Sequence, residues 1–191
     1  MRTLFIDFDG TICHDRFWRS LDKNSYAKVQ DSLFSGKNQI VRDWMRGVYS
    51  SEEINQIVAK DTGIEYESLW NVFVQDCHTM RIEPEILKLI SGLRDRYHVV
   101  LITGNMDCFS RFTVPSLRLN EYFDSIVNSF DEKQLKSESG GDSFKKHVRG
   151  NLTDAILIED SENSCKVFES LGGRAYRVIS PEDTFKYLHM V

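Results

Sequence analysis

Two aspartates near the N-terminus are the first residues of this chain that could do chemistry. An apolar run at residues 4–6 leads directly into Asp7, and Asp9 follows two residues later, just before Gly10. In an extended segment, side chains two residues apart face the same side, so both carboxylates can lie close to one ligand. Gly10 permits a tight turn directly after them. The sequence therefore places two acidic groups where a hydrophobic strand is expected to end.

Two other apolar runs end in polar or acidic residues. Thr103 closes the run in LITGN (101–105), and Glu159 and Asp160 close the run in ILIED (156–160). In an open parallel sheet, ligands bind at the carboxyl ends of the strands, so these groups are expected to meet at one edge. Buried carboxylates repel one another and are costly to desolvate, so the cluster needs a cation. Hard oxygen ligands suit Mg²⁺, which we expect as the cofactor.

The elements that must position these groups alternate along the chain. Short β-branched or apolar runs without clear alternation predict buried parallel strands. They cover residues 3–7, 99–103, 125–129, 155–160 and 175–179. Helical patterns lie between them, at 84–93, 107–119, 144–148 and 162–171. Pro115 must kink or divide the second of these helices. The pattern predicts an α/β fold with a Rossmann-like, mostly parallel, five-stranded sheet.

Residues 14–80 interrupt that alternation, because their apolar residues recur only at helical spacing. Ser50 and Glu53 form a capping-box pattern that predicts a helix start, and Gly63 predicts the end of that helix. We therefore expect two domains: an α/β core of residues 1–13 and 81–191, and a helical cap of residues 14–80. Three tryptophans at helical spacing are expected to form the core of this cap. They are Trp18, Trp44 and Trp70.

Composition narrows the classes of protein that remain. The 191 residues are 41% hydrophobic and 28% charged, with a net charge of −5, so no basic face for nucleic acid is implied. The first ten residues lack a signal-peptide pattern, and no apolar run is long enough to span a membrane. Four scattered cysteines are typical of reduced thiols, and we expect a cytoplasmic protein with no obligate protein partner. The cysteines are Cys13, Cys77, Cys108 and Cys165.

Four ordered motifs resemble those of the haloacid dehalogenase-like (HAD) hydrolase superfamily. They are DFDGT at 7–11, LITGN at 101–105, a lysine within 136–146, and IEDS at 158–161. The helical insert falls where that superfamily places its C1-type cap. The sequence EDSENS (159–164) is similar to that of the β-phosphoglucomutase and phosphoglycolate phosphatase branch. The resemblance covers essentially the whole chain and implies a capped Rossmann-like fold.

The resemblance also implies roles for the acidic residues. Asp7 would be the nucleophile that attacks phosphorus and forms an aspartyl-phosphate. Asp9 would be the general acid for the leaving oxygen and then the base that activates water. Mg²⁺ would be held by Asp7, the backbone carbonyl of Asp9 and Asp160, with Glu159 either supporting these ligands from behind or bound through water.

Three further residues are expected to bind the transferring phosphoryl group. The resemblance assigns this role to the hydroxyl of Thr103, the backbone N–H of Gly104 and one lysine. Lys136 is preferred, although the spacing between it and the following phenylalanine is stretched relative to the superfamily. Lys145 and Lys146 remain alternatives, although helix lysines are more often solvated.

The helical insert and its borders are expected to choose the substrate. His14 and Arg16 follow the first motif closely and could line the entrance, and Asn105 is either a further contact or only a helix cap. Arg42 and Arg46 could reach a second anionic group on the substrate, although a lone helix arginine is more often solvated.

The sequence thus predicts a Mg²⁺-dependent phosphatase that hydrolyses a small phosphorylated metabolite, without nucleic acid or membrane as a partner. A phosphomutase of the same fold and a non-catalytic phosphate-binding regulatory protein are the alternatives. Dehalogenation is disfavoured, since the haloacid-cleaving members lack an acid at the position of Asp9. A phosphonate-cleaving Schiff base would need a lysine in the insert, and nothing singles out Lys23 or Lys28.

Overall fold

The core of the protein is a parallel β-sheet. The computed structural model describes residues 1–36 and 39–191, and within them the sheet has five strands in the order β3-β2-β1-β4-β5. The strands are β1 (Arg2–Ile6), β2 (Tyr97–Thr103), β3 (Ser125–Asn128), β4 (Ile156–Glu159) and β5 (Arg174–Arg177). Every neighbouring pair runs parallel. The predicted α/β fold and five-stranded sheet are confirmed, with strand ends displaced by one or two residues.

The register of the sheet brings three strand ends together. Ile6 at the end of β1 pairs with Leu101 of β2 on one side and with Ile158 of β4 on the other. Because β1 is central, the residues that follow it lie between the carboxyl ends of its two neighbours. Asp7 and Asp160 therefore come just beyond adjacent strand ends, and Thr103 is the last residue of β2.

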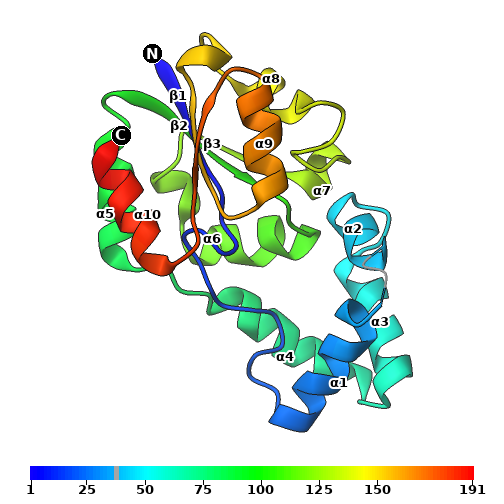
Figure 1. Ribbon diagram of the computed structural model, residues 1–191. Helices are drawn as coiled ribbons and strands as arrows, with labels where there is room; N and C mark the ends of the chain where they lie inside the picture. The colour runs from blue at the N-terminus through cyan, green and yellow to red at the C-terminus, as the bar shows by residue number, and fades with distance from the viewer. Residues whose placement is uncertain (37–38) are drawn as a thin grey trace.

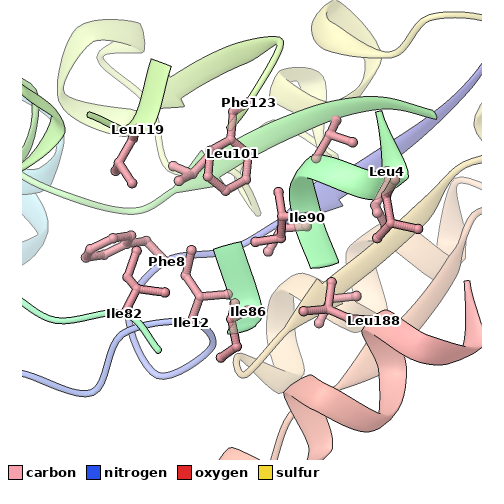
Figure 2. Packing of buried hydrophobic residues seen from close by; sticks show 14 of the residues in the cluster. Leu4, Phe8, Ile12, Ile82, Ile86, Ile90, Leu101, Leu119, Phe123 and Leu188 are labelled. Carbon is pink, nitrogen blue, oxygen red and sulfur yellow. The ribbon is translucent and has the colours of Figure 1, made fainter. Parts of the chain in front are cut away.

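Both faces of the sheet are covered by helices, which explains the continuous apolar runs. On one face, Leu4 and Ile6 pack in a buried cluster with α5 (Pro84–Leu93) and α10 (Pro181–Met190); Figure 2 shows part of this cluster, including Ile90 and Leu188. On the other face, Phe5 makes edge-to-face contacts with two phenylalanines. They belong to α8 (Asp142–His147) and α9 (Glu162–Ser170). Alternate residues of β1 thus serve two separate cores.

The segment at 107–119, expected to be a helix that Pro115 kinks or divides, is divided. It forms a π-helical turn η1 (Phe109–Thr113), a short α6 (Val114–Ser116) and a 3₁₀ turn η2 (Leu119–Glu121). Pro115 lies in the first turn of α6, where its missing N–H is tolerated. Arg118 has a φ of +52°, which ends helical geometry before η2. A further short helix, α7 (Ser129–Glu132), follows β3 and was not predicted.

The helical insert, residues 14–80, lies beside the carboxyl-end edge of the sheet (Figure 1). It contains α1 (Lys23–Phe34), α2 (Gln39–Met45), α3 (Ser51–Thr62) and α4 (Tyr66–His78). The capping box of Ser50 and Glu53 is present, and Gly63 ends α3 with a φ of +71°. Trp18 and Trp44 are buried in one aromatic cluster with Phe73, on which the half-buried Trp70 stacks.

These aromatic residues belong to a larger hydrophobic cluster that also includes Met106 and Cys108 from the segment after β2. The boundaries of a separate helical domain, 14–80, therefore stay a prediction. The four cysteines of the whole chain are free and buried. No helix in the described part of the chain is both long and apolar enough to cross a membrane.

Candidate active site

A pocket of about 260 Å³ lies at the carboxyl ends of β1, β2 and β4. We call it the strand-end pocket. It is lined by Asp7, Asp9, Met45, Gly104, Leu135, Lys136, Ser137, Glu159, Asp160, Ser161 and Ser164. A larger groove of about 670 Å³ lies between α5 and α10, away from these strand ends. The strand-end pocket is the one that gathers the acidic motifs of the sequence.

The first acidic motif leaves β1 through a tight turn. The Asp7 N–H still donates to the Ile158 carbonyl at 3.0 Å, so Asp7 stays anchored to β4. Gly10 then has a φ of +77°, and a Cβ there would lie 2.3 Å from Asp160 Oδ2. Only glycine lets the turn after β1 approach the Asp160 carboxylate this closely.

Lys136 is the lysine that the fold brings into the pocket. Its buried ammonium forms an ion pair with Asp7 Oδ1, lies 2.6 Å from Glu159 Oε2, and donates to the Ile102 carbonyl at 3.3 Å. Burial alone would lower the pKa of Lys136, but the charges of Asp7 and Glu159 outweigh that effect and raise this pKa above its usual range. Lys145 and Lys146 pair with surface acids instead. The stretched spacing of the lysine motif is accommodated by the turns between β3 and α8.

Asp9 lies on the other side of Asp7, next to two residues that were expected to contact substrate. Asn105 Nδ2 donates to Asp9 Oδ2 at 2.6 Å, and Arg16 Nη1 lies 4.0 Å from Asp9 Oδ1. Burial and the charge of Asp7 raise the pKa of Asp9 to about 7, although its side chain is 34% exposed. Asn105 also caps the next turn by accepting from the Met106 N–H at 2.9 Å. Asn105 is thus a partner of Asp9 as well as a cap.

The remaining predicted substrate contacts are placed less centrally. His14 is exposed and is absent from the lining of the strand-end pocket. Arg16 is also absent from the lining, with a side chain 54% exposed. Arg46 is bound by Glu138 and Asp43 rather than by the pocket. The structure therefore does not bring His14 or Arg46 into the pocket.

Thr103 and Gly104 end β2 beside the pocket. Gly104 lines it directly, while the Thr103 side chain is buried. Within the described residues, Thr103 Oγ1 has no hydrogen-bond partner. A buried hydroxyl without a partner is costly, so this atom is suited to donate to an oxygen of a ligand.

The carboxylates at the strand ends fit a divalent cation. One oxygen each of Asp7, Glu159 and Asp160 can be chosen so that all three lie within 4.8 Å of one another. Burial, and then the charge of Asp7, raises the pKa of Glu159 well above its ordinary value, and burial raises that of Asp7. One lysine does not neutralise this much negative charge. The set consists of hard oxygens, which are the ligands that Mg²⁺ takes.

The three carboxylates are not equivalent as ligands. Glu159 Oε1 accepts from the Ser161 N–H at 3.0 Å, and its other oxygen faces Lys136. The Asp160 carboxylate has no hydrogen-bond or ion-pair partner in the part of the chain that the structure describes. Asp7 and Asp160 are therefore the residues that could bind a metal directly, while Glu159 positions Lys136.

Two residues of the site carry no signal in the sequence. Met45, at the end of α2, lines the pocket from the helical insert. Ser129 Oγ donates to the Met45 carbonyl at 2.8 Å and accepts from the Asn105 N–H at 3.0 Å. Both lie outside the four motifs, so only the folded arrangement identifies them.

No protein-family model and no curated protein matches the sequence. Solved structures do match over nearly the whole chain. A HAD-family enzyme from Bacteroides thetaiotaomicron is 18% identical, with a TM-score of 0.69 over 93% of each chain. A mutant of that enzyme in complex with magnesium and inorganic phosphate is 19% identical, with a TM-score of 0.73 over 92% of this chain and 93% of the other.

An L-2-haloacid dehalogenase from Xanthobacter autotrophicus, with chloropropionic acid covalently bound, is also similar. It is 11% identical, with a TM-score of 0.66 over all of this chain and 83% of the other. The chain therefore has the fold of the HAD-family enzymes, which include hydrolases of more than one chemical class.

Proposed function

We propose that this protein is a Mg²⁺-dependent phosphatase that hydrolyses a small phosphorylated metabolite through an aspartyl-phosphate on Asp7. The observation that carries the proposal is the convergence of Asp7, Asp9, Lys136 and Asp160 in one pocket from three separate segments. The bound magnesium and phosphate in the Bacteroides enzyme support it by similarity of fold. We further propose a cytoplasmic location, given the free cysteines, with no nucleic acid, membrane or obligate protein partner.

Asp7 supplies the nucleophilic oxygen. Lys136 holds Oδ1 of Asp7, and Thr11 Oγ1 lies 3.5 Å from Oδ2, so the carboxylate is oriented before substrate binds. A new O–P bond forms at Asp7 as the bond from phosphorus to the leaving oxygen breaks. Thr103 and the Gly104 N–H bind oxygens of the phosphoryl group, with Lys136 beside them.

Asp9 moves the proton. In its protonated form it donates to the leaving oxygen, so the product departs as a neutral alcohol. A pKa of about 7 leaves a useful fraction of Asp9 protonated at neutral pH. In the second step the Asp9 carboxylate accepts a proton from water as that water attacks phosphorus. The bond between phosphorus and the Asp7 oxygen breaks, which releases inorganic phosphate and the Asp7 carboxylate. Asn105, which donates to Asp9 Oδ2, fixes the carboxyl group in place for both steps.

The cluster cannot meet a phosphate dianion without further positive charge. Two like unit charges 4 Å apart repel by about 4 kcal/mol at an effective dielectric constant of 20. Mg²⁺, held by Asp7 and Asp160, would supply the charge that offsets this repulsion when it is bound. Lys136, which pairs with Asp7, contributes further positive charge.

The test is a screen of phosphorylated metabolites with the purified protein. Inorganic phosphate should be released in the presence of Mg²⁺ and should stop when EDTA is added. Ca²⁺ should substitute poorly, because its larger and looser coordination holds the reacting groups farther apart. Phosphate release that does not depend on metal would contradict the proposal. Transfer of the phosphoryl group to a second hydroxyl, without release, would favour a phosphomutase instead.

A further inference from the structure

The helical insert contributes to the lining of the strand-end pocket. Among the described residues that line the pocket, Met45 alone comes from that insert. Its terminal methyl lies 4.0 Å from where a Cβ on Gly104 would be. Its carbonyl accepts from Ser129 Oγ at 2.8 Å, so the backbone at the end of α2 is fixed to the segment after β3.

The next residue, Arg46, connects the end of α2 to residues 135–138, which we call the lysine loop. Its guanidinium binds Glu138 through Nε at 3.1 Å and through Nη2. Glu138 Oε2 also accepts from the Leu135 N–H at 3.1 Å. One carboxylate therefore joins the helical insert to residues 135–137, which line the pocket on either side of Lys136. Neither side chain is free in solution, since they are 24% and 32% exposed.

The charges of the pocket are unfavourable for a second anionic group. Its lining contains four carboxylates and, among the described residues, Lys136 as its one basic side chain. Arg46, which follows Met45 in the insert, is neutralised by Glu138 and by Asp43 at 3.2 Å. Arg16 lies 4.0 Å from Asp9, outside the pocket lining. Beyond the phosphoryl group, the pocket offers the apolar side chains of Met45 and Leu135 and three uncharged serines. The volume of about 260 Å³ is below the range of drug-sized sites.

Building on the proposed function, we propose that the Arg46–Glu138 ion pair holds Met45 over the pocket and thereby limits the substrate to phosphomonoesters of small, uncharged alcohols. Met45 sets the size limit. Glu138 sets the charge limit, because it occupies the arginine that would otherwise attract a carboxylate or a second phosphate. Arg46 and Glu138 are positioning residues, since they act through Met45 and through the lysine loop.

Three phosphomonoesters separate size from charge. Isobutyl phosphate has a small neutral leaving group, and 2-phosphoglycolate has one of the same branching with a carboxylate. Naphthylmethyl phosphate has a bulky neutral leaving group that is an alkyl alcohol, like that of isobutyl phosphate. The kcat/KM of the wild-type protein with Mg²⁺ should be highest for isobutyl phosphate, by about tenfold or more over either of the others, a step typical of steric or charge discrimination.

The variants should change the ratios of kcat/KM between these substrates in different ways. Met45→Ala should raise the kcat/KM for naphthylmethyl phosphate relative to that for isobutyl phosphate by about tenfold. Glu138→Gln keeps an acceptor for the Leu135 N–H but removes one of the two charges that neutralise Arg46, leaving the one on Asp43. The kcat/KM for 2-phosphoglycolate should therefore rise relative to that for isobutyl phosphate, mainly through a lower KM. Glu52→Gln is the matched control. It breaks another ion pair of the insert, with Arg111 at 2.7 Å outside the pocket lining, and should leave both ratios unchanged.

Wild-type preference for 2-phosphoglycolate would overturn the inference while leaving the proposed function intact. The same holds if Glu138→Gln and Met45→Ala, confirmed to be folded by their unfolding temperatures, leave all ratios unchanged. Equal changes in Glu52→Gln would also overturn it, because they would indicate general loosening of the insert. If none of the three compounds releases phosphate with folded wild-type protein and Mg²⁺, the proposed function and this inference both fail.

Discussion

Buried carboxylates occur in two regions of this protein, and the groups that surround them differ. At the junction between the helical insert and the sheet, Asp107 accepts from Trp44 Nε1 at 3.2 Å, the Ser51 N–H at 3.1 Å and Arg111 at 2.7 Å. Asp76, in α4 of the insert, also has hydrogen-bond donors around its carboxylate. It accepts from the N–H and hydroxyl of one serine at 3.0 and 2.6 Å.

The strand-end carboxylates are crowded together instead of being paired with donors. Asp7 and Glu159 share one ammonium, that of Lys136, while Asp160 faces them without a partner among the described residues. Fully satisfied buried acids stabilise a fold, whereas acids that repel one another cost stability and are kept for binding or chemistry. Burial depth alone therefore does not separate structural from functional acids; the clustering of three carboxylates within 4.8 Å of one another does.

The largest effect is expected for Asp9→Asn acting on alkyl phosphates. The variant retains the nucleophile but cannot protonate a poor leaving group, so kcat should fall by about 10²- to 10⁴-fold. An activated aryl phosphate should lose much less, because its leaving group departs without a proton. Steady-state rates on a matched alkyl and aryl pair check this, and equal losses on both would remove Asp9 from the acid role.

Lys136→Ala should lower kcat/KM by about 10²-fold or more, a loss typical for one donor at a reacting centre. The loss follows from the missing charge beside Asp7 and the phosphoryl group. Lys145→Ala is the control, because that lysine pairs with Asp142 at the surface. An equal loss of activity in Lys145→Ala and Lys136→Ala would contradict the assignment of Lys136 as the lysine of the site.

Asn substitutions in the two regions should change stability in opposite directions. Asp107→Asn should lower the free energy of unfolding by about 2 kcal/mol, because a charged acceptor with several donors is lost. Asp7→Asn in metal-free protein should keep or raise it, because one of the crowded negative charges disappears. Urea unfolding in EDTA measures both. A large destabilisation by Asp7→Asn would mean that the strand-end acids are also structural.

The smallest effect concerns His98, which lies near the amino end of β2, far from the strand-end pocket. Burial, together with the charge of Arg149, lowers the pKa of His98. The unfolded state therefore binds a proton at a higher pH than the folded state does. Stability contributed here is present above pH ~6.5, the usual histidine pKa, and is lost as the pH falls through the folded-state pKa.

His98→Gln should therefore reduce the loss of unfolding temperature between pH 7.5 and pH 5.5. Its activity at pH 7.5 should match that of the wild-type protein, since His98 is remote from the pocket. Melting curves at the two pH values give the first result and phosphate release gives the second. An unchanged pH dependence would indicate that His98 is already protonated in the fold.

Local rules made much of the fold predictable. Apolar runs without alternation identified all five strands, and the capping box at Ser50 and the proline at 84 marked helix starts that the structure contains. The segment after β2 was less predictable. Its π-helical turn and the left-handed Arg118 depend on packing against the helical insert and on the limits that Pro115 imposes, which periodicity does not express.

The site was predictable where its residues follow strand ends. Asp7, Thr103 and Asp160 are placed by the sheet itself, so a short motif is enough to locate them. Met45, Ser129 and Glu138 come from helices and turns whose positions depend on tertiary contacts, and no local pattern distinguishes them. The same limit explains why Arg46 was a candidate substrate contact: its ion pair with Glu138 joins residues 92 positions apart.

The central claim is that phosphoryl transfer passes through Asp7, and its most direct measurement is the mass of the protein during turnover. Protein mixed with Mg²⁺ and an aryl phosphate should be quenched in acid and analysed by peptide mass spectrometry. One phosphoryl group should appear on the peptide that contains Asp7, and it should be absent with EDTA and in Asp7→Asn protein checked for deamidation. Turnover that continues at the wild-type rate in Asp7→Asn, or a phosphoryl group on another residue, would contradict the account.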